Sequence, residues 1–164
     1  MIVASTIVTY SSLVRVSQPA MLKPLAWPHE AETFAGIAFS KGDYDQAAEL
    51  QRKVLEAAKQ LGDPVGIART NWDLAQIDLA RNDDQAALPR LIESFQILGR
   101  LQQPDGVAVV GFVLGRLLLA VGQPDEARRV LTAAHAAAVK LGWTDRVQQI
   151  SELFSQSAPP AEET

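Results

Sequence analysis

Hydrophobic and polar positions recur along most of the chain with a period of 40 residues. When the sequence is shifted by 40 against itself, residues of the same kind coincide without a gap. The coinciding sets are Phe34/Leu74/Leu114, Ala35/Ala75/Gly115, Ile37/Ile77/Leu117, Ala47/Ala87/Ala127, Leu61/Leu101/Leu141, Pro24/Pro64/Pro104 and Gly42/Asn82/Gly122. Self-similarity at a fixed period indicates a repeat architecture. We therefore divide the chain into units 24–63, 64–103 and 104–143, with a partial unit over 144–157.

Each unit predicts two helices, which we call helix A and helix B. In the second unit, apolar residues recur at helical spacing on both sides of a polar break at 81–84. Asn82 in this break stands where the other units have glycine, and both residue types tolerate the left-handed conformation that ends a helix. Pro64 suits the first turn of a helix. The predicted helices cover 28–40, 44–61, 65–81, 84–101, 105–121, 125–141 and 144–156.

One such hairpin cannot bury its own apolar faces, whereas stacked hairpins can. The pattern therefore predicts an all-α solenoid of antiparallel helix pairs, with three full repeats and a C-terminal capping helix. Ala75 and Gly115 on helices A, and Ala87 and Ala127 facing them on helices B, mark close crossings within each hairpin. A larger side chain there is expected to overpack the crossing and to cost roughly 1–3 kcal/mol.

The two ends of the chain differ from the repeats. Residues 1–23 contain no Asp or Glu and are rich in Ser, Thr, Val and Ile, so we expect an N-terminal cap or a loosely ordered arm. Residues 158–164 hold two prolines and two glutamates, which is typical of a disordered tail. The most apolar stretch, 107–121, contains Arg116 and is shorter than the roughly 20 residues of a membrane span. It predicts a buried helix.

Composition and charge exclude several kinds of chemistry. The net charge is −4, whereas nucleic-acid binding needs a basic face. The absence of cysteine and the presence of only two histidines exclude cysteine-based and histidine-rich metal sites. The acidic pair Asp83–Asp84 lies at a predicted helix start, where capping explains it. We therefore expect no enzyme activity, no metal and no cofactor.

In this order, the apolar and small positions resemble the tetratricopeptide repeat family. The second unit supplies Leu74-Ala75 on helix A, Asn82-Asp83 at the turn and Ala87 on helix B. The period of 40 is similar to the long-helix variety, which occurs in cell-polarity adaptors and in sensor arms of bacterial regulators. The resemblance covers residues 24–157 and implies a right-handed solenoid that holds a protein segment in its concave groove.

The resemblance also places particular residues on the concave surface. On the second and third helices A these are Arg69, Trp72, Gln76, Val109, Phe112 and Arg116, and on the first they are His29 and Glu32. Aromatic and arginine side chains are enriched at binding hot spots. The alternative interpretation is that Trp72 and Phe112 pack against the next repeat. The lysine and asparagine clamp of the chaperone-binding members is absent.

The sequence thus favours a non-enzymatic adaptor, or a subunit of a larger complex, that binds a protein or peptide partner. The alternative is a peptide-sensing regulatory arm of a signalling or transcription-control system. The expected location is the cytoplasm, with no nucleic-acid partner and no membrane span. The partner's identity and the oligomeric state, including a homo-oligomer, stay open.

Overall fold

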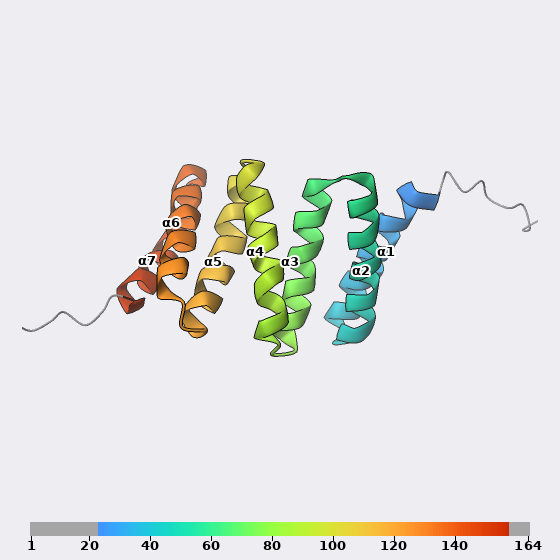
Figure 1. The fold of residues 1–164 in the computed structure, drawn as a ribbon, viewed down its shortest axis with the longest axis horizontal. Helices are drawn as coiled ribbons and strands as arrows, with labels where there is room; N and C mark the ends of the chain where they lie inside the picture. The colour runs from blue at the N-terminus through green and yellow to red at the C-terminus, as the bar shows by residue number, and fades with distance from the viewer. Residues whose placement is uncertain (1–22, 158–164) are drawn as a thin grey trace, which may run out of the picture.

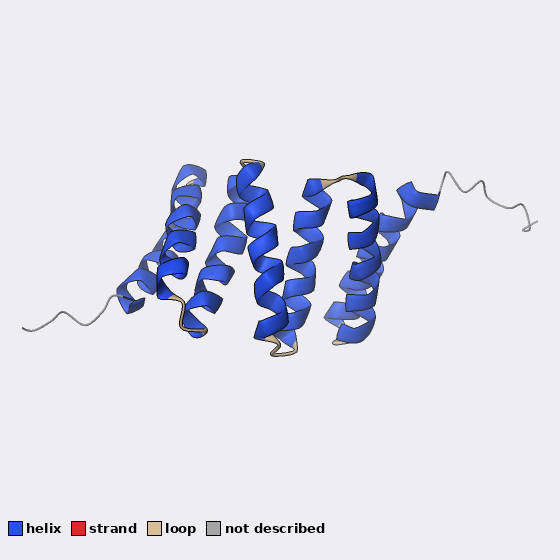
Figure 2. Cartoon of the chain, in the orientation of Figure 1, coloured by secondary structure: helices blue, strands red, loops and turns tan. Residues whose placement is uncertain are grey.

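The computed structural model describes residues 23–157 as a row of α-helices joined by short turns. The helices are α1 (Lys23–Ser40), α2 (Tyr44–Leu61), α3 (Pro64–Ala80), α4 (Asp84–Arg100), α5 (Pro104–Ala120), α6 (Pro124–Leu141) and α7 (Thr144–Ser157). They stand side by side, with α1 and α7 at opposite ends of the row (Figure 1), and no strand occurs over 23–157 (Figure 2).

The all-α stack of helix pairs predicted from the period is confirmed. The helix boundaries agree with the predicted ones to within one residue except at α1, which begins at Lys23 rather than at residue 28. The prolines at the starts of α3, α5 and α6 lie in the first turn, where a missing N–H leaves no hydrogen bond unmade. The predictions for residues 1–22 and 158–164 lie outside the described residues.

Successive turns between the helices share one geometry, which recurs every 20 residues. Each turn has one residue with positive φ; the residues are Gly42, Gly62, Asn82, Gln102, Gly122 and Gly142. The N–H of the following residue donates to the carbonyl five positions earlier, as Asp43 does to Ala38 at 2.9 Å and Gln123 to Leu118 at 2.8 Å. This bond satisfies a carbonyl that the helix end would otherwise leave unpaired. The predicted left-handed positions 42, 82 and 122 are confirmed.

Aspartates begin the helices in the first half of the repeat array. The Asp43 carboxylate accepts from the Gln46 N–H at 3.1 Å, and Asp83 accepts from the Ala86 N–H at 3.0 Å. Asp63 caps α3 in the same way, through two backbone N–H groups. Each cap pairs a donor that lacks a partner within the helix. The capping role predicted for Asp83 is confirmed.

The small residues predicted at the helix crossings are buried. Ala75 is fully buried, and Gly115 lies so close to α6 that an added Cβ would stand 2.4 Å from Leu131 Cδ2. A Cβ on Gly111 would meet Ala134 of α6 at 2.9 Å. The seam between α5 and α6 is therefore formed by these two glycines. The residue that Gly115 meets is Leu131, one helical turn beyond the predicted Ala127.

The first repeat is less covered than the repeats that follow it. Phe34 on α1 is 60% exposed, whereas Leu74 and Leu114 at the equivalent positions are 0% and 1% exposed. Leu74 belongs to a core cluster with residues of α2, and Leu114 to one with residues of α4. Within residues 23–157 no helix precedes α1. The structure therefore presents an exposed apolar face at this end.

Candidate binding surface

Two cavities open between successive helices A. The first pocket, of about 310 Å³, lies between α1 and α3 above α2 and is lined by Glu32, Ala35, Gly36, Phe39, Gln51, Arg69, Asp73, Gln76 and Ile77. The second pocket, of about 320 Å³, lies between α3 and α5 above α4 and is lined by Val65, Ala68, Arg69, Trp72, Ser94, Leu98, Gln103, Asp105, Gly106, Val109, Val110 and Trp143. Arg69 lines both pockets, so they adjoin. We call the surface that bears them the helix A face.

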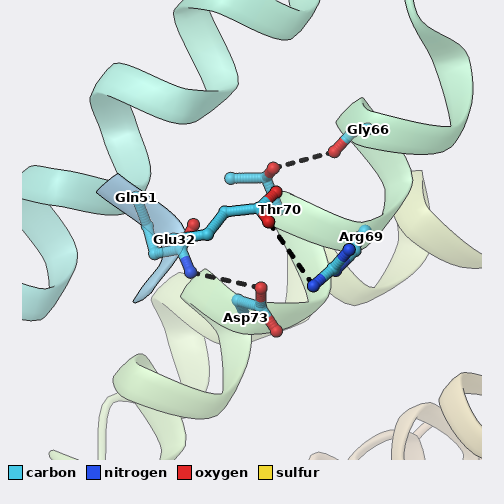
Figure 3. Close-up of polar contacts among 6 residues, drawn as sticks. All are labelled: Glu32, Gln51, Gly66, Arg69, Thr70 and Asp73. Carbon is cyan, nitrogen blue, oxygen red and sulfur yellow. Dashed lines mark hydrogen bonds and ion pairs between the residues drawn. The ribbon is translucent and has the colours of Figure 1, made fainter. Parts of the chain in front are cut away.

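The first pocket holds a polar network drawn from three helices (Figure 3). Gln51 of α2 donates from Nε2 to Asp73 Oδ2 of α3 at 3.2 Å, and Arg69 Nη2 lies 3.5 Å from Glu32 Oε2 of α1. Gln51 is only 5% exposed. Its Oε1 atom and the Nε2 atom of Gln76 are buried without a hydrogen-bond partner among the described residues. The pocket therefore combines charged groups with unsatisfied amide atoms.

Burial raises the pKa of Asp73 above its usual value, and the charge of Glu32 adds to the rise, although Arg69 and the hydrogen bond from Gln51 oppose it. A carboxyl group with a raised pKa binds its proton more tightly in the folded state than in the unfolded chain. The free energy of unfolding therefore falls as the pH rises from the usual aspartate pKa through the raised one. Above that pH range the buried Asp73 carboxylate destabilises the fold.

We expect Asp73→Asn to raise the thermal midpoint at pH 7, because the variant has no buried charge at this position. The difference from the unmodified protein should shrink as the pH is lowered, since Asp73 then becomes protonated in both states. Thermal unfolding followed by circular dichroism between pH 7 and pH 4 measures this difference. Asp84→Asn on the exposed start of α4 is the matched control. A gain that is the same at all pH values would contradict burial as its cause.

The second pocket is mainly apolar and carries two tryptophans. Trp72 of α3 is half-buried and packs against the core, and Val109 of α5 lies across the pocket from it. Trp143, which is 36% exposed, joins the lining from the turn before α7. The buried Ser94 hydroxyl donates to the Ala68 carbonyl at 2.8 Å and fixes α4 beneath α3. This pocket suits an apolar side chain of a ligand.

Two arginine side chains contact one aromatic ring on α5, that of Phe112. The guanidinium carbon of Arg146 in α7 is 4.4 Å from the centre of the Phe112 ring, and that of Arg116 is 5.8 Å away. Both distances fall within the range of cation–π attraction. Phe112 also packs against the core cluster that Leu131 and Ala134 of α6 form with Ile150 of α7. The alternative interpretation of Phe112 as a contact to the next repeat is thus partly confirmed.

The structure divides the predicted groove residues between these features. Five of them line the two pockets: Glu32, Arg69, Trp72, Gln76 and Val109. Phe112 and Arg116 line neither pocket; they contact each other on α5 through a cation–π interaction. The side chain of His29 lies outside the described ones. That these residues bind a partner stays a prediction.

Sequence reasoning missed Gln51, Asp73, Trp143 and Arg146. The period of 40 carries a signal for the first two. Gln51 stands where the later repeats have Leu91 and Leu131, both fully buried, and Asp73 stands where they have Val113. A polar residue at a repeated core position marks a site that packing alone does not explain. Trp143 lines the second pocket and Arg146 contacts Phe112, and both belong to the partial repeat that follows or to the turn before it. Residue spacing within one helix does not predict contacts from another repeat.

Metal-ligating side chains do not gather in the described part of the chain. No group of three or more His, Cys, Asp or Glu there could hold a metal ion. The ring centre of His135 in α6 lies 6.5 Å from that of Phe154 in α7, in an edge-on contact, so His135 takes part in the packing of these two helices. Among helices α1 to α7, none is long and apolar enough to cross a membrane.

Comparison with known proteins bears on the repeats directly. No curated protein matches the sequence. A family model described as tetratricopeptide repeat matches residues 29–100, which run from α1 to the end of α4. The same turn geometry continues after this segment, at Gln102, Gly122 and Gly142. Residues 29–100 are therefore similar to tetratricopeptide repeats, and α5, α6 and α7 extend the same helical stack.

Proposed function

We propose that the chain is a non-enzymatic, cytoplasmic adaptor that binds a segment of a protein partner across the helix A face. Tetratricopeptide repeats mediate protein–protein interactions, which gives the general class. The observation that carries the proposal is the pair of adjoining pockets between α1, α3 and α5, which share Arg69. The first pocket carries charged and amide side chains and the second pocket does not share most of them, so an extended segment laid across both meets two different sets of contacts.

The half-buried Trp72 is the anchor of this surface. A large aromatic side chain in a partly desolvated pocket is the typical centre of a protein interface, and the surrounding contacts contribute less. Trp72 lines the second pocket, and Val109 and Trp143 line its other sides. Phe112 with its two arginines extends the surface toward α7.

Removal of both aromatic anchors should abolish most partner binding. The variant Trp72→Ala/Phe112→Ala is compared with the unmodified chain in affinity capture from the source lysate, with the bound protein identified by mass spectrometry. Truncation of a hot-spot aromatic commonly weakens binding by about 2 kcal/mol or more, which is roughly 30-fold. Because Phe112 also packs against α7, circular dichroism must show that the double variant stays helical.

Two further variants locate the site. Val109→Glu places a charge in the second pocket without truncating a core residue, and it should also abolish capture. Phe34→Ala truncates an exposed aromatic at the end of the stack, and capture should be unchanged. Capture that persists in Val109→Glu and is lost in Phe34→Ala would move the site from the helix A face to the exposed end of α1.

A further inference from the structure

The first pocket differs from the equivalent place in the next repeat. A shift of 40 maps its lining residues Glu32, Gln51 and Asp73 onto Trp72, Leu91 and Val113. The later junction is apolar, and Leu91 is 0% exposed there. The same backbone arrangement is thus filled by apolar side chains in one repeat and by an amide and two carboxylates in the other. The later junction shows that the fold itself does not require the polar residues.

The polar residues of the first pocket are also incompletely satisfied. Gln51 is 5% exposed, and its Oε1 atom has no hydrogen-bond partner among the described residues. A buried polar atom without a hydrogen-bond partner destabilises a protein, because it has lost its bonds to water and gained none. Burial of Asp73 acts in the same direction, as its raised pKa indicates. Groups that weaken the fold and face a cavity are expected where a ligand completes their interactions.

The charges that face the pocket leave an excess of negative charge. Glu32 and Asp73 are acidic, and Arg69 is the one basic side chain among the residues that line it. Arg69 lies nearest to Glu32, and its side chain is 63% exposed, so it sits at the rim. Asp73 accepts from the neutral Gln51 amide and lies deeper. The excess of negative charge and the unpaired Gln51 Oε1 favour a cationic ligand with several hydrogen-bond donors, whereas the unpaired Gln76 Nε2 needs an acceptor.

We propose that the first pocket binds an arginine side chain presented by the partner segment, with Asp73 as its carboxylate acceptor and Gln51 as the residue that orients Asp73. The proposal rests on the proposed function, since the arginine belongs to the bound segment. A guanidinium group carries five N–H donors in a planar fork that matches a carboxylate. The volume of about 310 Å³ is sufficient for one such side chain.

The neighbouring second pocket extends this specificity. Because Arg69 lines both cavities, a segment whose arginine enters the first pocket places its adjacent residues near Trp72 and Val109. An apolar residue close to the arginine would fill the second pocket. The recognised sequence is therefore a basic residue beside an apolar one.

The test uses two peptides that differ only in charge. The acetylated and amidated peptide Gly-Gly-Arg-Gly-Gly is titrated into the full chain, and NMR follows the side-chain amide signals of Gln51 and Gln76. The control peptide carries citrulline, a neutral analogue of arginine with nearly the same shape. We expect the arginine peptide to shift both signals and to bind about tenfold or more tightly than the citrulline peptide. Equal binding of the two peptides would overturn the proposal.

Two single variants determine the sign of the ligand's charge. Asp73→Asn should lower the affinity for the arginine peptide to that for citrulline, whereas Arg69→Gln should raise it by removing a competing cation. Glu93→Gln on the exposed side of α4 is the matched control and should change nothing. The opposite pattern, with binding lost in Arg69→Gln and kept in Asp73→Asn, would show an anion site and would overturn the proposal.

The double variant Gln51→Leu/Asp73→Val gives the first pocket the residues of the later repeats. We expect a protein with a thermal midpoint at least as high as the unmodified chain and with no preference for the arginine peptide. A lower midpoint would show that the polar pair serves the fold, and the proposal would fail.

Partner capture separates this inference from the proposed function. If capture depends on Trp72 but is unchanged in Asp73→Asn, the adaptor surface stands and the arginine assignment is wrong. If the arginine peptide binds through Asp73 but capture is unchanged in both Trp72→Ala and Asp73→Asn, the pocket chemistry stands and the partner binds elsewhere.

Discussion

Gly115→Leu should lower the free energy of unfolding by about 3 kcal/mol, near the upper end of the usual range for overpacking. An added Cβ alone would stand 2.4 Å from Leu131 Cδ2 and 2.5 Å from Leu131 Cγ. Leu131 is fully buried and forms a core cluster with Ala134 and Ile150, so a shift of its side chain would disturb that packing. The larger side chain must therefore separate α5 from α6. Urea unfolding followed by circular dichroism measures the loss.

Two further variants support the interpretation of Gly115→Leu. A Cβ on Gly99 would meet no atom within 4 Å, so Gly99→Leu should leave the stability nearly unchanged. Ala75→Leu at the equivalent crossing of the second repeat should destabilise the fold by roughly 1–3 kcal/mol. Unchanged midpoints in both Gly115→Leu and Ala75→Leu would mean that the helices do not approach as closely as the structure shows.

Leu91→Ala should be comparably damaging, with a loss of about 2–5 kcal/mol. Leu91 is 0% exposed and belongs to the largest core cluster, which joins α3, α4, α5 and α6. Its truncation removes apolar contacts and leaves a cavity that fixed neighbouring helices cannot close. The midpoint of urea unfolding should fall while the slope of the transition stays the same.

Leu61→Ala is the comparison for Leu91→Ala. Leu61 ends α2 with 59% of its surface exposed, so its truncation should change the stability by about 0.5 kcal/mol or less. Similar losses in the two leucine variants would show that α4 is not held between α3 and α5.

Much of the fold could be predicted because its constraints act on the backbone and recur. Gly42, Asn82 and Gly122 fall at one point of the period, and each of them adopts positive φ. Ala75 and Gly115 are small because a neighbouring helix leaves no room. Gln102 stands where the neighbouring units have Gly62 and Gly142, so the period marks its position although glutamine itself has no preference for positive φ. It adopts φ 54° because the flanking helices require a turn there.

The candidate site could be predicted only where its residues lie on helices A at helical spacing. Arg69, Trp72 and Val109 satisfy that condition, and they line the pockets. Gln51 lies on helix B, on a face that the period assigns to the core, and its contact with Asp73 crosses from one repeat to the next. Side-chain contacts between repeats depend on the distance between their helices. The spacing of residues along the sequence does not give that distance.

The exposed face of α1 has a consequence for how a ligand would act on this end of the stack. In a linear array each repeat is stabilised mainly by its neighbours, so a terminal unit with one neighbour opens at a smaller free energy than the units inside. Phe34 and Ile37 mark that unit within the described residues. The first pocket takes its lining from α1, α2 and α3. A ligand bound there contacts both the first and the second repeat. Its binding would therefore raise the free energy of local unfolding of the first repeat.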